Sequence, residues 1–452
     1  MTKSADSSAD SFAGSRLPAL AREAVLYTLP LYEMARMRAA TCPRRRREGA
    51  FADARPDGTL RWVNQFFHTR QLLGPQHRQV VTPNNDTLYS NAWLDLSQGP
   101  LLLEVPDSAG RYYVLGLLDF YTNPFAYIGS RTTGTQAGRF LLHGPGWQGE
   151  APAGATAIAC PTDAVWLLGR LLVDGPDDLP AVHALQDRFR LTLPDGGDAV
   201  RAYDVGMQPN EHLGASPQQV RRYADVVNRA LRENPPPADE AATVQAFAAL
   251  GLGAASEGVP LKETQVALLA AAMEQVLAEL ARPMPSALGG GWNLPVEIGA
   301  SFGTRYAERA QVARNYIGAL GMEEAMYIIA DCDAHGRPLD GNEPHELAFP
   351  AGQLPQVGAF WSLTMYDKGD CMLVENPIAR YSLGDRSPSL RYEPDGSLRL
   401  HLGAAAPRDA ARHGNWLPAP AGPFYVALRL YVPGAAHLGK TFSYPGIQAV
   451  EA

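Results

Sequence analysis

Residues 82–96, TPNNDTLYSNAWLDL, join a polar turn to an alternating run of side chains. The first five residues have turn chemistry, because asparagine and aspartate side chains bond to nearby backbone and tolerate unusual φ values. From Thr87 onward the polar and aromatic positions fall on one side, and they are Tyr89, Asn91, Trp93 and Asp95. The intervening positions are small or apolar. This alternation predicts a half-buried strand whose small, apolar side faces a β-sandwich core.

Short β-rich runs surround this strand from about residue 60 to residue 175. They read NAWLDL, PLLLEV, RYYVLGLLDF, RFLLHG, TAIACP and AVWLLGRLLV, and Gly, Pro and Asn separate them. Strands at such regular spacing are typical of a sandwich or a barrel. From about residue 295 the same texture returns, and PDGS at 394–397 is a hairpin signal.

Helical periodicity occurs before and between the two β regions. The segments 179–192, 216–234, 262–281 and 303–320 place apolar residues three and four apart. Ser216 is a candidate N-cap, and the prolines at 235–237 end the helix that follows it. A helix is also expected within 17–40, where Pro30 should kink it or end its first part.

These patterns predict a mainly β chain with a helical insert. The expected divisions are a disordered tail (1–15), an N-terminal helical segment (16–59), a first β-sandwich (60–178), a helical linker region (179–290) and a second β-sandwich (291–449). No short-period repeat is present, which argues against a solenoid or a propeller.

Composition excludes several classes of protein. With 46% hydrophobic residues, 19% charged residues and a net charge of −8, the chain has an ordinary globular balance and no basic face for nucleic acid. The four cysteines lie far apart, without a C-x-x-C pair. No signal-peptide pattern and no membrane-length apolar run is present, so a cytoplasmic protein without membrane contacts is expected.

Four long segments resemble one known family. They are 82–96, LLDFYTNPFAYIGSRTTGTQAGRFLLHGPGW (117–147), FWSLTMYDKGDCMLVENPIARYSLGDRSPSLRY (360–392) and NWLPAPAGPFYVALRLYVP (415–433). The chain resembles, over roughly residues 17–448, the two-domain family of domain of unknown function 1254 followed by domain of unknown function 1214. The resemblance implies two antiparallel jelly-roll-like sandwiches with intervening helices, and a homo-oligomer.

Two aspartates are the candidate catalytic groups. Asp86 lies in the opening turn, and Asp119 follows a strongly apolar strand, where a carboxylate is costly unless it is paired. Paired carboxylates can divide acid and base roles because their repulsion separates their pKa values. In this hypothesis Asp86 or Asp119 is the base, and Tyr89 or Tyr121 is the acid.

Polar and aromatic neighbours of these groups are candidate substrate ligands. They are Asn84, Asn85, Asn91, Trp93, Asn123, Arg131 and Arg380. Structural alternatives stay open: the side chains of the strand could satisfy neighbouring loops, Asp119 could pair with Arg131, and Arg380 could pair with a nearby aspartate.

Metal and cofactor chemistry has little support in the pattern. No cofactor is expected, since neither a phosphate loop nor a Rossmann glycine pattern is present. Ca²⁺ or Mg²⁺ between the two aspartates is a minor alternative without the regular D-x-D-x-D-G loop, and a non-haem iron site from distant strands is another.

Two hypotheses about function follow from these residues. The first is a cofactor-independent enzyme, a hydrolase or a lyase, acting by acid/base chemistry on a small polar or amphiphilic substrate held in the N-terminal sandwich. The alternative is a non-catalytic protein that binds a carbohydrate or an anion.

Overall fold

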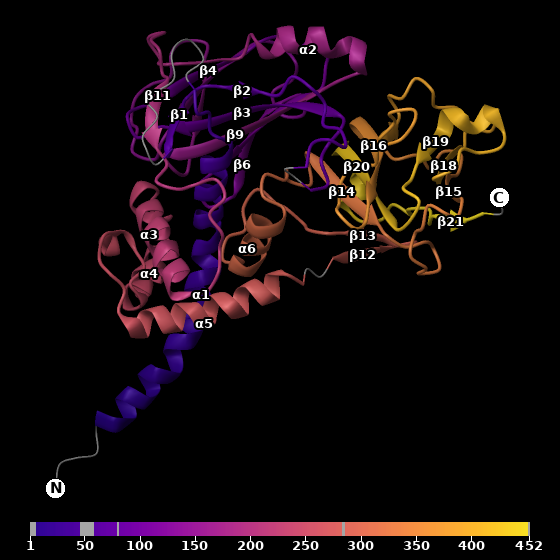
Figure 1. The fold of residues 1–452 in the computed structure, drawn as a ribbon. Coiled ribbons are helices and arrows are strands. Elements are labelled where there is room, and N and C mark those ends of the chain that lie inside the picture. The colour runs from indigo at the N-terminus through magenta and orange to yellow at the C-terminus, as the bar shows by residue number, and fades with distance from the viewer. Residues whose placement is uncertain (1–5, 46–57, 79–80, 283–284, 451–452) are drawn as a thin grey trace.

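The computed structural model describes residues 6–45, 58–78, 81–282 and 285–450, and their side chains from residue 16 onward. Two β-rich halves lie side by side, with a group of helices beneath the first half (Figure 1). The predicted mainly β, two-domain architecture with a helical region is confirmed. Of the expected tail, residues 1–5 lie outside the described part, and a helix begins at Asp6.

The first sandwich consists of two facing sheets. In spatial order, sheet A contains β2 (Phe67–His68), β3 (Thr87–Asp95), β9 (Ala164–Leu172), β5 (Tyr113–Leu118) and β6 (Pro124–Gly129). Sheet B contains β10 (Arg190–Thr192), β4 (Leu101–Val105), β7 (Gly138–His143) and β8 (Thr156–Ala159). A separate pair joins β1 (Leu60–Val63) to β11 (Arg201–Asp204). Since β10 pairs with β4, this sandwich takes in chain beyond residue 178.

The alternation of the opening strand sets the core of this sandwich. Leu88, Ala92 and Leu94 of β3 pack with Leu103 and Phe140 of sheet B, and all are buried. The predicted division of β3 into a core side and an outer side is therefore confirmed. The outer side faces other parts of the molecule.

The second sandwich repeats this arrangement with different strands. Sheet C contains β12 (Ser286–Gly289), β13 (Trp292–Leu294), β14 (Ala325–Ala330), β20 (Phe424–Pro433), β16 (Val357–Asp367) and β17 (Ser382–Gly384). Sheet D contains β19 (Trp416–Pro418), β18 (Leu398–Gly403), β15 (His345–Phe349) and β21 (Gln448–Ala449). A short helix, α7 (Ala435–Leu438), follows β20.

Two strand pairs depart from the sequence predictions. The pairs β7–β8 and β18–β19 are parallel within otherwise antiparallel sheets. The turn predicted at residues 394–397 is confirmed, and Glu393 N–H donates across it to Ser397 O at 2.9 Å. The hairpin ladder does not extend further, because β18 pairs with β15 and β19.

The helices form a layer against sheet A. They are α1 (Asp6–Thr41), α3 (Pro217–Glu233), α4 (Ala241–Ala246), α5 (Glu263–Leu280) and α6 (Tyr306–Asn315), while α2 (Leu179–Gln186) lies on the far side of the sandwich (Figure 1). Ser216 caps α3 through a capping box with Gln219, as predicted. The described helices include none that is long and apolar enough to span a bilayer.

Helix α1 does not end at Pro30. Of the two outcomes expected there, a kink or an end of the helix, the end is therefore wrong. The helix continues to Thr41, and the residues on both sides of Pro30 are buried. Proline removes one helical hydrogen bond, but tertiary packing supplies most of the stability of a helix in a folded protein. Contacts with α3, α5 and α6 outweigh that loss here.

The outer face of sheet A is covered by two different partners. Near Trp93 and Trp166 it packs against α1, and near Val114 and Leu172 it packs against Phe360 and Tyr431 of sheet C. A single face thus has a helix-covered end and a domain-covered end.

Candidate functional site

Strand register aligns two rows of side chains at the domain-covered end. In sheet A, Tyr89 lies beside Arg170. In sheet C, Tyr327, Arg429 and Ser362 lie beside one another on adjacent strands. Directly paired residues share a face of the sheet, so each row presents its side chains together.

The two rows meet across the domain boundary. Arg170 donates a hydrogen bond from Nη1 to the Tyr327 hydroxyl, and Ser362 donates to Asp86. We call this group the interdomain cluster; it consists of Asp86, Tyr89, Arg170, Tyr327, Ser362, Ser382, Arg429 and Tyr431.

The Asp86 carboxylate belongs to both domains. Its backbone is fixed on the first sandwich by Asn84 Oδ1 (2.6 Å) and by Val173 (3.1 Å). Its side chain accepts hydrogen bonds from Ser362 Oγ (2.7 Å) and Ser382 Oγ (3.5 Å). Burial raises the pKa of Asp86, and the opposing influence of Arg429 and the two hydroxyls does not cancel that rise.

The turn before β3 inserts into the second domain. Thr82 has a φ of 51°, which is rare for a β-branched residue. Its amide donates to Cys371 O, its hydroxyl lies 2.7 Å from the Tyr425 hydroxyl, and its carbonyl accepts from Arg429 (3.1 Å). Tyr366 donates to Pro83 O at 2.6 Å. These contacts hold the turn in a strained conformation next to the interdomain cluster.

Arg170 is buried among neutral groups. It is 6% exposed, and its guanidinium lies over the rings of Tyr89 and Tyr327 at 5.7 and 5.8 Å. Besides Tyr327 it donates to Gly318 O at 3.0 Å. In the described part of the chain its Nε has no acceptor.

Arg429 is placed in the same way on the other domain. It is 3% exposed, donates to Thr364 Oγ1 (2.8 Å) and Thr82 O (3.1 Å), and its Nε likewise lacks an acceptor among the described residues. The cluster therefore holds two buried guanidinium groups and one carboxylate, Asp86, whose pKa is raised. Because an unbalanced buried charge is costly, this arrangement favours an added anion.

Four members of the cluster keep contact with solvent, one of them Ser382. Asp86, Tyr89 and Tyr327 are half-buried, whereas the two arginines beside them are almost fully covered.

The predicted convergence of Asp86 and Asp119 is wrong. Asp86 precedes Thr87, which pairs with Leu172 of β9, and Asp119 follows Leu118, which pairs with Trp166. The part of β9 between Trp166 and Leu172 spans about 20 Å at 3.3 Å per residue. The two carboxylates thus lie at opposite ends of sheet A, too far apart to share a substrate atom or a metal ion.

Asp119 organises a closed turn at the helix-covered end. It accepts hydrogen bonds from the backbone of Tyr121 and Asn123 (2.9 Å each) and from Asn123 Nδ2 (2.8 Å). Burial raises the pKa of Asp119 to about 6. The Tyr121 hydroxyl is buried and donates to Asn234 O, so these predicted catalytic and binding groups have structural partners.

The outer side of β3 is also largely closed by structure. Asn91 donates to Thr41 O and accepts from Trp166, and Trp93 donates to Thr41 Oγ1 at 2.9 Å. Asn91 and Trp93, which were predicted to be substrate ligands, are therefore covered by the C-terminal end of α1.

The remaining predicted ligands lie in separate places. Asn84 reaches Tyr431 (3.1 Å) and supports the cluster, and Asn85 donates to Leu73 O. Arg380 donates to the carbonyls of His413 and Trp416 within the second sandwich. These contacts show that Arg380 is a structural residue away from the cluster.

Arg131 pairs across the domain boundary and not with Asp119. Its Nε lies 2.6 Å from Glu324, a buried carboxylate that also accepts from Tyr112. Arg131 also lines a pocket of about 210 Å³ at the domain boundary. In the same pocket, Arg386 forms an ion pair with Asp174. The charges of that pocket are thus balanced by neighbouring side chains.

Metal binding has no cluster to support it in the described residues. Within those ranges no group of three or more His, Cys, Asp and Glu side chains could hold a metal ion. The separation of Asp86 and Asp119 removes the particular arrangement considered for Ca²⁺ or Mg²⁺.

Comparisons with known proteins match both halves. A family model described as "Protein of unknown function (DUF1254)" matches residues 63–193, and one described as "Protein of unknown function (DUF1214)" matches residues 324–435. The chain belongs to the two-domain DUF1254–DUF1214 family. No curated protein matches the sequence.

A solved structure supports the fold of this DUF1254–DUF1214 protein. The VPA0106 protein from Vibrio parahaemolyticus is 23% identical, with a TM-score of 0.72 over 96% of this chain and 100% of that one. A putative uncharacterized protein from Burkholderia cenocepacia is 12% identical, with a TM-score of 0.42 over 95% of this chain and 88% of that one. At 23% identity, the similarity to the Vibrio structure supports the fold and nothing further.

The interdomain cluster draws on both family segments. Asp86 and Arg170 lie in the DUF1254 part, and Ser362, Ser382 and Arg429 lie in the DUF1214 part. Sequence reasoning missed the residues from strands β9 and β20. The available signal was an arginine inside each apolar run, AVWLLGRLLV and FYVALRLYVP, because a charged residue in a buried strand needs a partner.

Proposed function

We propose that this DUF1254–DUF1214 protein is a cofactor-independent enzyme of the hydrolase or lyase type that acts on a small anionic substrate held between its two domains. Arg170 and Arg429 bind the anionic group, and Asp86 transfers a proton. Tyr89 and Tyr327 contact the remainder of the substrate. Compared with the sequence hypothesis, Asp119 and Tyr121 have no part in the chemistry.

The excess of buried positive charge carries this proposal. Two guanidinium groups with unpaired Nε atoms lie near one carboxylate whose pKa is raised. Arginine N–H groups suit a carboxylate or phosphate, and the bound anion would replace solvation that burial has removed. A carboxylate with a raised pKa is closer to the range in which a general base or acid works at neutral pH.

Proton exchange tests the proposal without knowledge of the natural substrate. Mandelate, malate, 3-hydroxybutyrate and phenylacetate are incubated with the protein in D₂O, and loss of the C–H signal next to the carboxylate is followed by NMR. A base beside a bound carboxylate exchanges that proton even when no complete turnover occurs. Asp86→Asn should abolish the exchange without weakening probe affinity, because the substitution removes a like charge beside the anion.

Asp119→Asn is the matched control. It removes the other buried carboxylate with a raised pKa, at the far end of the same sheet, and should leave the exchange rate unchanged. Equal loss of exchange in both variants would point to a general effect on folding and contradict a role for Asp86.

Non-catalytic binding of an anion is the second candidate. The unpaired Nε atoms of Arg170 and Arg429 favour it equally, because they require an anion and no chemistry. Saturable probe binding that is lost in Arg429→Gln, with no exchange for any probe, would select binding over catalysis. A cytoplasmic location and a homo-oligomer stay predictions, the latter open to size-exclusion chromatography with light scattering.

A further inference from the structure

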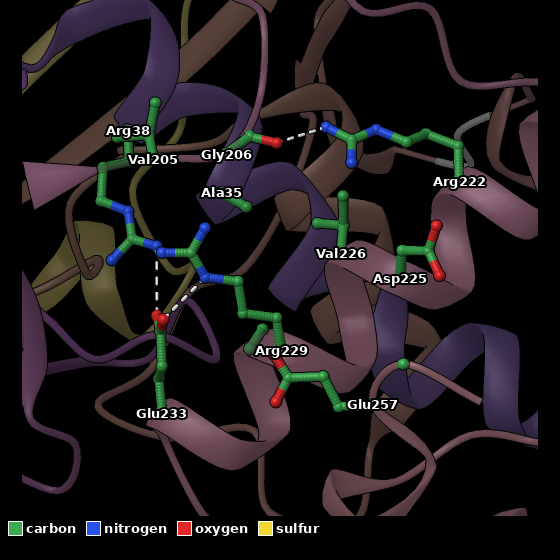
Figure 2. A pocket seen from close by; sticks show the side chains of 12 residues that line it. Ala35, Arg38, Val205, Gly206, Arg222, Asp225, Val226, Arg229, Glu233 and Glu257 are labelled. Atoms are coloured by element: carbon green, nitrogen blue, oxygen red, sulfur yellow. Dashed lines mark hydrogen bonds and ion pairs between the residues drawn. The ribbon is translucent and has the colours of Figure 1, made fainter. Parts of the chain in front are cut away.

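A second pocket lies in the helical layer, away from the interdomain cluster. It has a volume of about 300 Å³ and opens between α1, α3 and the chain after β11. Figure 2 shows the side chains that line it, among them two guanidinium groups directed at Glu233. Its inner wall carries aliphatic side chains, namely Ala35, Val205, Val226 and Ala230.

Arg38 is the buried charge of this pocket. It is 5% exposed and lies between the rings of Phe120 and Tyr203, at 4.7 and 4.5 Å. Its Nη2 is 3.5 Å from Glu233, and in the described part of the chain its Nε has no hydrogen-bond acceptor. This guanidinium is held in place by aromatic stacking but is incompletely neutralised.

Arg229 shares the same carboxylate. Its Nε lies 2.7 Å from Glu233, which also accepts a hydrogen bond from Tyr203 at 2.5 Å. Burial would raise the pKa of Glu233, but Arg38, Tyr203 and Arg229 outweigh it and hold that pKa below its ordinary value. Glu233 is therefore ionised at neutral pH, and its one carboxylate lies beside Arg38, Arg229 and, at 3.5 Å, Arg232.

The other charges around the pocket balance one another. Arg222 pairs with Glu211 at 2.7 Å, and Glu257 pairs with Arg232. Three arginines and three carboxylates line the pocket, so its total charge is balanced, with Asp225 at the exposed rim. The positive charge is local, because Arg38 and Arg229 share Glu233 next to the aliphatic wall.

We propose that this pocket binds a small organic carboxylate, with its carboxylate group on Arg38 and Arg229 and its hydrocarbon chain along the aliphatic wall. The volume is at the lower end for small-molecule sites and suits a ligand of about four to six carbons. The aliphatic wall distinguishes an organic anion from inorganic phosphate. This site is separate from the proposed function and does not depend on it.

Hexanoate is the probe for this site, measured by isothermal titration calorimetry on the full chain. Saturable binding with a dissociation constant of about 0.1–1 mM is expected for a ligand of this size. Added salt should weaken it, because screening reduces the attraction of the arginines. Hexylamine should not bind, and inorganic phosphate should bind more weakly; phosphate binding tighter than hexanoate would overturn the assignment.

Two substitutions move the affinity in opposite directions. Arg229→Gln should weaken hexanoate binding at least about tenfold, since a charge-assisted contact is lost. Asp225→Asn should strengthen it about two- to threefold, because a like charge leaves the rim. Because Asp225 is exposed, Asp225→Asn should fold normally. It therefore still tests the proposal if Arg229→Gln fails to fold. Asp239→Asn, an exposed aspartate outside the pocket, is the matched control and should have no effect.

Arg429→Gln separates this pocket from the interdomain cluster. Hexanoate binding that survives Arg429→Gln and falls in Arg229→Gln supports the proposal. Binding lost in Arg429→Gln and kept in Arg229→Gln assigns hexanoate to the interdomain cluster and contradicts it. Absence of saturable hexanoate binding in the unmodified protein also contradicts it.

Discussion

The two ends of the outer face of sheet A use the same strands for different purposes. At the helix-covered end, the indole N–H groups of Trp93 and Trp166 and the carboxylate of Asp119 all have protein partners. At the domain-covered end, Arg170 and Arg429 keep N–H groups without acceptors in the described structure. Among the described residues, unsatisfied N–H groups also occur at the helix-covered end, at Arg309 over the ring of Tyr121. The ends differ in access: Asp119 is buried, whereas Asp86, Tyr89 and Tyr327 at the domain-covered end are half-buried, and a buried unsatisfied group near solvent marks a place where a ligand could bind.

The largest effect is expected at the helix-covered end. Trp93 is fully buried and stacks on Trp166 with ring centroids 5.2 Å apart. Trp93→Ala should lower the free energy of unfolding by about 3–5 kcal/mol, measured by urea denaturation, because it leaves a large cavity under α1. Trp147→Ala, at a half-buried indole beside His143, is the control and should cost clearly less. Equal losses of unfolding free energy in Trp93→Ala and Trp147→Ala would contradict a special contribution of the helix-covered end to stability.

A pair of arginine substitutions contrasts balanced and unbalanced charge. Arg131→Met leaves the buried carboxylate of Glu324 without its cation and should cost about 2–4 kcal/mol. Arg170→Met removes an unbalanced charge together with its hydrogen bonds, so the free energy of unfolding should change by less than about 1 kcal/mol. Binding of the carboxylate probes should nevertheless fall at least about tenfold in Arg170→Met. A loss of stability in Arg170→Met as large as in Arg131→Met would contradict the charge excess.

The pH dependence of stability sharpens the comparison at Asp119. Its pKa is about 6 in the folded protein against an ordinary 3.8, so the folded state binds more protons between these values. The contribution of Asp119 to the free energy of unfolding should therefore fall as pH rises from about 4 to about 6 and level off above that range, whereas carboxylates with lowered pKa values, such as Glu233 and Asp178, contribute in the opposite direction. Asp119→Asn should lack this contribution, while the one from Asp86, whose pKa burial also raises, should remain. Thermal unfolding from pH 4 to 7 measures it, with the exposed Asp177→Asn as control.

The smallest effect is expected at the rim of the domain boundary. Arg386 and Asp174 form an ion pair in which both side chains are substantially exposed. Arg386→Ala should change the free energy of unfolding by about 0–1 kcal/mol, because solvent screens such pairs. A cost of several kcal/mol in urea denaturation would show that this pair, and not the buried contacts, joins the domains.

Local sequence patterns predicted the parts of this molecule that depend on periodicity. The alternation from Leu88 to Leu96 correctly divided β3 into a core side and an outer side. The same pattern could not tell what covers the outer side, because α1 and sheet C come from distant parts of the chain. Asp86 and Asp119 were placed together on residue type alone, and the register of β9 separates them.

The site itself depends on pairings between domains. Arg170 and Tyr327 meet only because two sheets pack face to face, and no local signal encodes that contact. An arginine in an apolar strand indicated that some partner exists, but the identity of the partner required the structure. Arg131 illustrates the same limit: the nearby Asp119 was considered as its partner, while the distant Glu324 occupies that place.

Helix α1 has a consequence for the order of events during synthesis. It is synthesised before α3, α5 and α6, against which its buried side packs, and α6 ends at Asn315. At bacterial or eukaryotic elongation rates, those partners emerge on the order of tens of seconds after α1. During that interval the apolar side of α1 has no permanent cover. A nascent chain that ends before residue 306 therefore leaves the apolar side of α1 without its contact to α6.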